Sequence, residues 1–290
     1  MIETLDIQSW QGPFDPATKA RTVAALEQGA VLYFPHLAFR LTASETRFLD
    51  PAVSDGKAKN ISLDPGTGKM QSSSLTGDKA AALAAMIERF GAGAATLVST
   101  LLPYRTVERA RTSYRPVQVA GRRYSKISDD RLLHVDAFPS RPMRGRRILR
   151  FFSNIAPDPA TGTRRWQIGE PFEDFARHFL PRLPPRWPGK AWAWDKLGVT
   201  RGRRSPYDEL MLSLHDAAKR DDAFQKNSPQ QAAHFPPGSS WLVFTDQVLH
   251  AALGGEFALE QTFHFDIAEM AEPARAPIKV LERLSGRALA

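Results

Sequence analysis

The sequence predicts a mainly β protein with flanking helices, whose strands form a jelly-roll, cupin-like barrel. Two observations indicate this fold class. Helical patterns dominate before residue 110, and short apolar runs typical of strands follow from Thr112 onward. In addition, His134 and His250 each lie at the end of an apolar run, although more than a hundred residues separate them. A jelly-roll barrel brings such distant strands to one mouth.

The chain of 290 residues is long enough for one large domain or two small ones. It contains no repeat and no clean linker, so we expect a single domain over residues 1–290. In this division, residues 1–110 are a helical part with a first strand and residues 111–270 form the barrel. A helical insert interrupts the barrel at about 170–225, and residues 271–290 end the chain as a helix.

The N-terminal elements follow from local signals. Asp15 and Pro16 suit the start of a helix that ends before Gly29, and residues 30–34 read as a buried strand. Residues 51–78 are rich in Gly, Ser, Asp and Lys without a period, which predicts a long loop that could act as a lid. An alanine-rich helix is expected over residues 79–102.

Within the barrel, residues 114–119 and 122–127 flank Ala120-Gly121 and predict a hairpin. Further strands are expected at 146–154 and 256–267, and helices at 171–180, 207–219 and 277–284. No uninterrupted apolar run approaches the length of a membrane span.

His134 and Asp136 can serve one metal ion. Residues i and i+2 of a strand point to the same face, so an imidazole and a carboxylate lie together there. With His250 they make two histidines and one carboxylate, the facial triad of non-haem Fe(II) oxygenases. His-x-Asp alone is a weak motif, and the alternative is a surface strand with two polar residues. We expect the other histidines to be dispensable for metal binding: His36, His178, His215, His234 and His264.

Several longer segments resemble the Kdo hydroxylase family. They are HVDAFPSRP, RRILRFFSN, GEPFEDFARHFLP, SPYDELMLSLHD, FPPGSSWLVFTDQVLHAAL and IKVLERLSGRAL. The resemblance implies a double-stranded β-helix and an Fe(II)- and 2-oxoglutarate-dependent dioxygenase. It also implies hydroxylation at C3 of the sugar 3-deoxy-octulosonic acid (Kdo) in Kdo-lipid A, giving Ko. The iron ligands would be His134, Asp136 and His250. The implied cofactors are Fe(II), 2-oxoglutarate and O2, with ascorbate as an additional candidate.

The far carboxylate of 2-oxoglutarate needs a buried cation, and the planar fork of arginine suits it. No Lys or Arg follows His250 until Arg275, so a basic residue on the strand after His-x-Asp is the better candidate. We choose Arg150, with Arg147 on the opposite strand face in reserve. Weaker candidates for hydrogen bonds to the cosubstrate are Asn154, Tyr124 and Gln261. Alternatively, these arginines contact only substrate or solvent.

A formal net charge of +8 favours an anionic partner. The Kdo carboxylate and lipid A phosphates would suit a mouth lined by Arg122, Arg123, Arg141, Arg144, Arg201, Arg203 and Arg204, which could equally be solvated surface residues. The N-terminus shows no secretory signal and there is no cysteine. The resemblance then implies a cytoplasmic protein, with peripheral contact at the inner face of the cytoplasmic membrane. The sequence leaves the oligomeric state open, and a homo-oligomer is one possibility.

Two other function classes remain. One is an Fe(II)/2-oxoglutarate hydroxylase of a protein or a small molecule, because fold does not fix substrate. The other is a non-catalytic basic module that binds nucleic acid. The arginines are scattered and no nucleic-acid-binding motif is present, so we expect no nucleic-acid partner.

Overall fold

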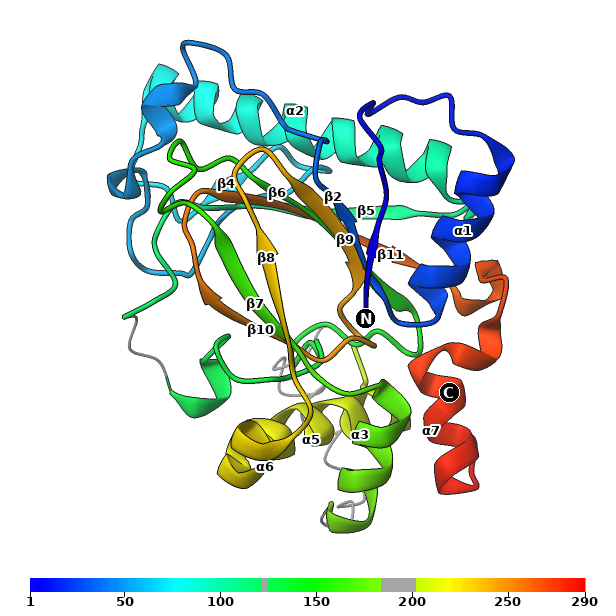
Figure 1. Cartoon of the computed structure of the whole chain (residues 1–290). Helices are drawn as coiled ribbons and strands as arrows, with labels where there is room; N and C mark the ends of the chain where they lie inside the picture. Colours follow the sequence, from blue (N-terminus) through cyan, green and yellow to red (C-terminus); the bar gives the residue numbers. More distant parts are fainter. Residues whose placement is uncertain (122–124, 184–201, 290) are drawn as a thin grey trace.

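The computed structural model describes residues 1–121, 125–183 and 202–289. Two β-sheets face each other; helices cover the outer face of the larger sheet and gather at one end of the smaller sheet (Figure 1). The larger sheet has the order β1 (Ile2–Thr4), β2 (Val31–Phe34), β9 (Ser240–Phe244), β6 (Arg147–Asn154), β11 (Ala258–Phe265), β5 (Glu108–Arg115), β3 (Ile61–Leu63) and β4 (Met70–Gln71). The smaller sheet has the order β10 (His250–Gly254), β7 (Arg164–Ile168) and β8 (Gln231–Phe235).

The chain passes repeatedly between the two sheets. It runs from β5 to the segment around His134, then to β6, β7, β8, β9, β10 and β11. His134 pairs with His250 through an isolated antiparallel bridge, so its segment extends the smaller sheet beside β10. The pairs β5–β11, β11–β6 and β6–β9 are all antiparallel. This connectivity is that of a jelly roll, and the predicted fold class is confirmed.

An aromatic cluster fills one part of the space between the sheets. Trp241 from β9 stacks on Phe152 and on Phe235, with ring centroids 5.0 and 4.1 Å apart. Trp166 from β7 meets Trp241 edge to face at 5.6 Å. These side chains are all buried, and large buried aromatic residues contribute strongly to core stability. The packed cluster confines the polar residues of the interior to the remaining part of the barrel.

Helix α2 (Gly77–Leu101) lies across the outer face of the larger sheet (Figure 1). It packs on β5 and β11, which Gly91 makes possible. A Cβ atom at Gly91 would lie 2.6 Å from Thr112 Oγ1 and 2.7 Å from Gln261 Oε1. By length and composition alone α2 could span a membrane. However, its buried face serves the protein core, as in many soluble proteins.

The first helix and strand agree with their sequence signals. Helix α1 (Pro16–Glu27) begins after Asp15, whose side chain accepts a hydrogen bond from Thr18 N. Gly29 follows with φ of +88°, a conformation that favours glycine. Strand β2 then enters the larger sheet between β1 and β9.

Helices α3 (Phe172–Phe179), α5 (Pro206–Arg220) and α6 (Asp222–Asn227) lie between β7 and β8 in the chain. They gather at one end of the smaller sheet, whereas α7 (Pro277–Ser285) lies beside α3 (Figure 1). Ser205 and Asp208 form a capping box that begins α5.

Two local predictions are wrong. Residues 51–78 were predicted as a loop, but they contain two strands. Strands β3 and β4 extend the larger sheet at its edge beside β5. The hairpin after residue 114 does not form: β5 pairs with β11 and β3, and Lys126–Ser128 is a 3-10 turn. Residues 122–124 of that predicted hairpin lie outside the described residues. In both cases a partner strand distant in sequence decides the pairing.

Candidate metal centre

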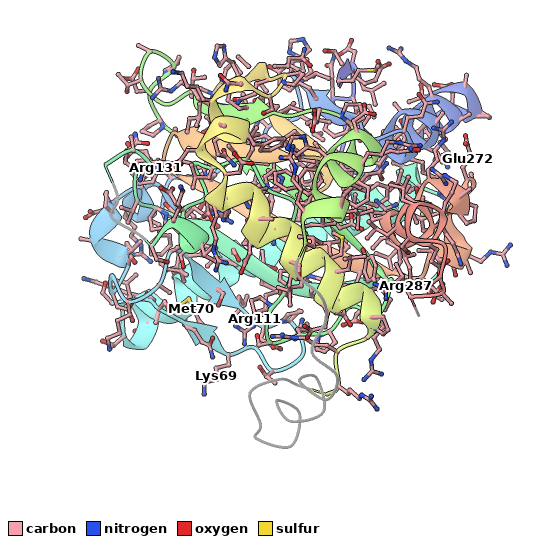
Figure 2. The ribbon with its side chains drawn as sticks, turned by 90° about the horizontal axis from the view of Figure 1, so that it is seen from below. Lys69, Met70, Arg111, Arg131, Glu272 and Arg287 are labelled. Atoms are coloured by element: carbon pink, nitrogen blue, oxygen red, sulfur yellow. The ribbon has the colours of Figure 1, made fainter. Side chains whose placement is uncertain are left out.

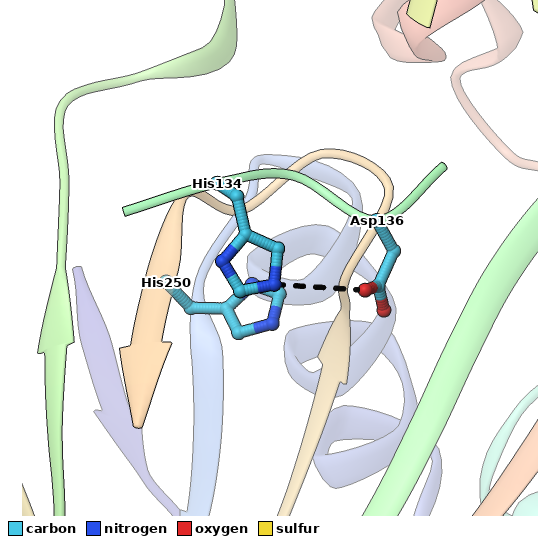
Figure 3. Close-up of side chains that lie close together, drawn as sticks. All are labelled: His134, Asp136 and His250. Atoms are coloured by element: carbon cyan, nitrogen blue, oxygen red, sulfur yellow. Dashed lines mark ion pairs between the residues drawn. The ribbon is translucent and has the colours of Figure 1, made fainter. Parts of the chain in front are cut away.

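Three potential ligands converge near one end of the smaller sheet. His134 and His250 are paired through their backbones, His134 N donating to His250 O at 3.1 Å and His250 N to His134 O at 2.9 Å. Asp136 is anchored two residues later, where its N–H donates to Thr245 O. The three side chains point toward one another (Figure 3), and one ligand atom from each lies within 4.8 Å of the others. His134 Nε2 is 3.9 Å from Asp136 Oδ1.

Backbone carbonyls determine which histidine nitrogen is available. His134 Nδ1 lies 2.7 Å from Leu132 O, and His250 Nδ1 lies 2.9 Å from Val248 O. A carbonyl can only accept, so each Nδ1 carries the proton and each Nε2 keeps its lone pair. Burial lowers the pKa of both imidazoles, which keeps them neutral. Trp166 stacks on His250 with centroids 5.1 Å apart and limits rotation of its ring. Both histidines are thus oriented to bind a cation through Nε2.

Asp136 is held in its charged form. Burial alone would raise its pKa, but the positive charge of Arg150 outweighs burial and the pKa lies below its ordinary value. Arg150 Nη2 is 2.9 Å from Asp136 Oδ2 and forms an ion pair with it. Asp136 Oδ2 is buried and accepts no hydrogen bond from the described residues. Such an atom is costly to leave unbound, and a metal ion would satisfy it.

The helical insert supports this centre from outside. Gln225 on α6 contacts both backbone groups of Leu133, the residue before His134. Its Oε1 accepts from Leu133 N at 2.8 Å, and its Nε2 donates to Leu133 O at 3.0 Å. The same Nε2 also donates to Ala218 O on α5. Gln225 thereby connects two helices of the insert to the segment that carries two of the three ligands.

A cavity of about 220 Å³ adjoins the three ligands between the sheets. Four cationic side chains line it: Lys59, Arg115, Arg150 and Arg164. Phe152 and Trp166 supply an apolar side that continues into the aromatic cluster. The cavity therefore combines a metal-binding edge with several cations, a combination suited to an anionic molecule that also contacts the metal.

A buried carboxylate organises two of these arginines. Glu260 on β11 lies between β5 and β6, with Oε2 2.5 Å from Arg115 Nη2 and Oε1 2.8 Å from Arg150 Nη1. Burial opposes ionisation of Glu260, but the two arginines outweigh it and its pKa lies below the ordinary value. A chain of ion pairs thus runs from Arg115 through Glu260 and Arg150 to Asp136.

Comparison with known proteins places this centre in a family. The model of the 3-deoxy-D-manno-oct-2-ulosonic acid (Kdo) hydroxylase family matches residues 9–288. The chain belongs to the Kdo hydroxylase family. A search of curated proteins found no match. The family membership implied by the motifs around His134 and His250 is confirmed.

Solved structures of the Kdo hydroxylase KdoO, a non-haem Fe(II) α-ketoglutarate-dependent dioxygenase, agree closely with this chain. The complex of KdoO with α-ketoglutarate (2-oxoglutarate) and Fe(III) is 43% identical over 100% of this chain and 97% of KdoO, with a TM-score of 0.95. A cobalt(II) complex is 44% identical over 99% and 97%, with the same TM-score. A complex with succinate and Fe(III) is 43% identical over 99% and 97%, with a TM-score of 0.94.

Within this Kdo hydroxylase fold, the residues predicted to bind 2-oxoglutarate lie in different environments. Arg150 lines the cavity beside Asp136, as the prediction requires. Arg147, the reserve candidate, does not line this cavity. It lies on the opposite face of β6, fully buried, with Nε 2.8 Å from Asp246 Oδ2 and Nη2 donating to Gln247 at 2.7 Å. Its guanidinium also stacks over Phe244, so its charge serves the core rather than the cavity.

Asn154 and Gln261, the weaker candidates for cosubstrate contacts, do not line the cavity either. Asn154 Nδ2 donates to Gly162 O and Phe235 O, and its Oδ1 accepts from Ala156 N, so its polar atoms hold a turn. Gln261 lies on the outer face of β11 under α2, where Oε1 accepts from Arg109 and Thr112. Side chains alternate along a strand, so the neighbouring Glu260 is the one that faces the interior.

Several predicted residues lie outside the described part of the chain, and others have new roles. Tyr124, Arg122, Arg123 and Arg201 are outside it. Arg204 is buried, donates to Pro139 O and pairs with Glu209 at 3.1 Å, so it is structural. Arg144 is exposed, and Arg141 lines a hollow near the metal centre. Among the described residues, His134, Asp136 and His250 are the one group of three His, Asp or Glu side chains whose ligand atoms lie close enough together to hold a metal ion.

Glu260, Arg115 and Arg164 were missed from the sequence, although a signal was present. Residues 258–265 form a strand in which Glu260, Thr262 and His264 alternate with Gln261 and Phe263. A charged residue on the interior face of a barrel strand is unusual and marks a site. The face could not be assigned without the register of β11 against β6, in which Glu260 pairs with Phe152.

Proposed function

We propose that this chain is an Fe(II)/2-oxoglutarate-dependent dioxygenase that hydroxylates C3 of Kdo in Kdo-lipid A, giving Ko. The observation that carries the proposal is the convergence of His134, Asp136 and His250 beside a cationic cavity. Family membership and 43% identity to KdoO over the whole chain support the reaction and the sugar. The position C3 and the lipid A anchor rest on the family resemblance.

The three residues would hold an Fe(II) ion. Two Nε2 lone pairs and an orphaned carboxylate oxygen are the donors of a 2-His-1-carboxylate centre. When bound, iron and 2-oxoglutarate supply the oxidising chemistry: O2 is consumed, 2-oxoglutarate becomes succinate and carbon dioxide, and one oxygen atom enters a substrate C–H bond. The chain's part is to keep both imidazoles neutral, hold Asp136 charged and exclude water with Phe152 and Trp166.

For the far carboxylate of 2-oxoglutarate, Arg150 remains our first assignment. It lines the cavity beside the metal ligands, and its buried Nε has no hydrogen-bond partner among the described residues. Arg164 replaces Arg147 as the second candidate. Arg164 is buried on β7 and shares a strand face with Trp166. The two residues are two positions apart, which corresponds to about 7 Å along the strand. A diacid bound to the metal at one end could reach it with the other.

The lipid A anchor would bring the enzyme to a membrane. We propose a cytoplasmic enzyme that contacts the inner face of the cytoplasmic membrane peripherally, where its anionic glycolipid is accessible. The excess of positive charge favours such a surface. Ascorbate would act only as a supporting reductant, and added ascorbate should prolong turnover rather than be required for it.

The test is turnover of purified protein with Fe(II), 2-oxoglutarate, O2 and Kdo-lipid A. Mass spectrometry should show the gain of one oxygen atom in the lipid, and fragmentation should place it on C3 of Kdo. Isotopically heavy O2 should label that position. If the enzyme holds iron and consumes 2-oxoglutarate but leaves Kdo-lipid A unchanged while a peptide or small molecule is oxidised, the chemistry is right and the substrate is wrong.

A further inference from the structure

A second hollow lies beside the metal centre. Its volume is about 340 Å³, which is within the range of small-molecule sites. The inner faces of β5 and β11 form one side, and residues 138–141 form another. Asn60 and Arg150 line both this hollow and the cavity at the metal ligands. Because Arg150 contacts Asp136, a molecule in the hollow would lie next to the metal centre.

The lining suits an acidic carbohydrate. Hydroxyl and amide groups come from Asn60, Ser113 and Thr262, and Phe138 provides one aromatic surface. Such a mixture of short polar groups and a single ring is typical of sites for a polyhydroxylated ligand. Arg111 and Arg141 add positive charge. Arg111 on β5 donates to Gln71 Oε1 on β4, the edge strand of the larger sheet that also carries Met70 (Figure 2).

Two polar groups that line the hollow lack hydrogen-bond partners among the described residues. Arg141 makes no hydrogen bond or ion pair with the described residues, although it is only partly exposed. His264 is 2% exposed, and its Nε2 is buried without a hydrogen-bond partner among the described residues. Burial lowers the pKa of His264 to about 4, so the ring is neutral at ordinary pH. A buried, unpaired ring nitrogen is costly unless a ligand or water completes it.

The loop that carries Arg141 is fixed in place. Arg204 donates to Pro139 O, and Asp208 Oδ1 accepts from Met143 N at 2.7 Å and from Arg144 N at 3.0 Å. The segment between these anchors is therefore held against the hollow by the start of α5. Because the backbone of this loop is already ordered, only the side chain of Arg141 would lose conformational freedom when it binds an anion.

We propose that this hollow is the binding site for the sugar ring of an acidic glycolipid, with Arg141 binding the sugar carboxylate and the His264 side of the wall facing its hydroxyl groups. The inference rests on the proposed function, because it names where that substrate binds. The carboxylate of Kdo is attached to C2, which neighbours C3. A cation close to the metal centre can therefore hold the carboxylate and leave C3 directed toward the ligands. The lipid anchor would extend outward past residues 139–141.

The test compares three variants with the wild-type holoenzyme. Arg141→Ala removes the proposed anion partner. Ser140→Trp introduces a bulky side chain at an exposed position in the lining, where folding is not at risk. Arg177→Ala is the control, since Arg177 lies on α3 outside the hollow with its side chain 59% exposed. Iron content and 2-oxoglutarate affinity are measured on each variant to show that it is folded.

We expect Arg141→Ala and Ser140→Trp to raise the half-saturating concentration of Kdo-lipid A by about tenfold or more, because a charge-assisted contact or the ring space is lost. Arg177→Ala should match the wild type. Equal substrate requirements in all four proteins would overturn the proposal.

A wild type that does not oxidise Kdo-lipid A would refute the proposed function separately. The hollow is then tested by calorimetry with free Kdo, under anaerobic conditions with cobalt(II) and 2-oxoglutarate. Weaker binding by Arg141→Ala than by wild type supports the acidic-sugar site, and no binding to wild type rejects it.

Discussion

Individual backbone carbonyls determine the chemistry of this centre as much as the ligands do. Leu132 O and Val248 O each accept a hydrogen bond from the Nδ1–H group of the histidine two residues later. The i to i+2 geometry is the same in both, so the two Nε2 atoms have equivalent roles. Asp136 differs, because its charge is maintained by Arg150 on a neighbouring strand. The three ligands are therefore held by local backbone geometry and by one long-range ion pair.

We expect His134→Ala, Asp136→Ala and His250→Ala each to abolish Fe(II)-dependent succinate formation, because each removes one of three metal donors. Iron content after dialysis and succinate release measure the effect. His234→Ala is the control, since His234 is exposed on β8 away from the cavity and should bind iron normally. Near-normal turnover of any triad variant at saturating iron would show that this residue is not a ligand.

Arg150→Ala should raise the 2-oxoglutarate concentration needed for half-maximal turnover by about tenfold to a thousandfold, as expected for loss of a charged partner. Titration of 2-oxoglutarate with the iron-loaded enzyme measures it, while iron binding is followed separately. An unchanged requirement for Arg150→Ala beside an impaired Arg164→Ala would transfer the assignment to Arg164.

The Arg147→Ala variant tests whether Arg147 stabilises the fold or binds 2-oxoglutarate. It leaves Asp246 buried and without its ion-pair partner, so it should cost about 3–5 kcal/mol of stability. Chemical denaturation measures this loss. Where Arg147→Ala folds, its 2-oxoglutarate requirement should equal that of wild type.

At the scale of elements, the insert between β7 and β8 supports the metal centre. Gln225 on α6 contacts Leu133 N and O, and Ser205 and Asp208 begin the preceding helix α5 with a capping box. Helices α5 and α6 therefore do more than cover the end of the smaller sheet. They fix the backbone immediately before His134, a segment that is also held by its isolated bridge to β10 and by the hydrogen bond from Asp136 N to Thr245 O.

Gln225→Leu should lower iron affinity about tenfold, although Gln225 is a positioning residue and not a ligand, because Leu133 would lose both of its side-chain hydrogen bonds. The conservative Gln225→Glu keeps the acceptor for Leu133 N and should retain part of the affinity. Lys226→Ala, at an exposed neighbouring position of α6, should bind iron as wild type does. An unchanged metal affinity for Gln225→Leu, with the protein correctly folded, would limit α6 to a covering role.

For the whole molecule, metal binding should couple to stability. The ligands come from the His134 segment and from β10, and the cosubstrate cavity lies between both sheets. A ligand that binds only the folded chain stabilises it by about 2.7 kcal/mol at a hundred times its dissociation constant. Cobalt(II) with 2-oxoglutarate should therefore raise the thermal unfolding temperature of wild type and leave that of His134→Ala nearly unchanged. Equal shifts in both proteins would indicate metal binding elsewhere.

Local sequence was sufficient for most of the elements and for the three candidate metal ligands that the structure brings together. The start of α1 after Asp15 and the i and i+2 pair His134 and Asp136 depend on neighbouring residues or on strand alternation. His250 was expected at the end of the apolar run 241–250, whereas β9 ends at Phe244 and His250 is the first residue of β10. The family motifs are equally local, so the fold class and the family were both predicted correctly. Arg150 lines the cavity for a local reason too, since residues 147–154 form one regular strand whose alternate side chains face the interior.

Only the tertiary structure decided which side of each strand faces the cavity. Gln261 and Glu260 are adjacent, yet α2 covers one and the metal pocket receives the other, because the register of β11 against β5 and β6 assigns the two faces. Arg147 forms an ion pair with Asp246, which lies about a hundred residues away in the chain, and no local pattern reveals this partner. Arg115, Arg164 and Lys59 meet in one cavity from different strands and loops. Sequence periodicity was therefore enough to predict the pair of candidate ligands on a single segment. Contacts between distant segments determined the pocket around them, because strand pairing and ion pairs between strands exist only once the sheets have formed.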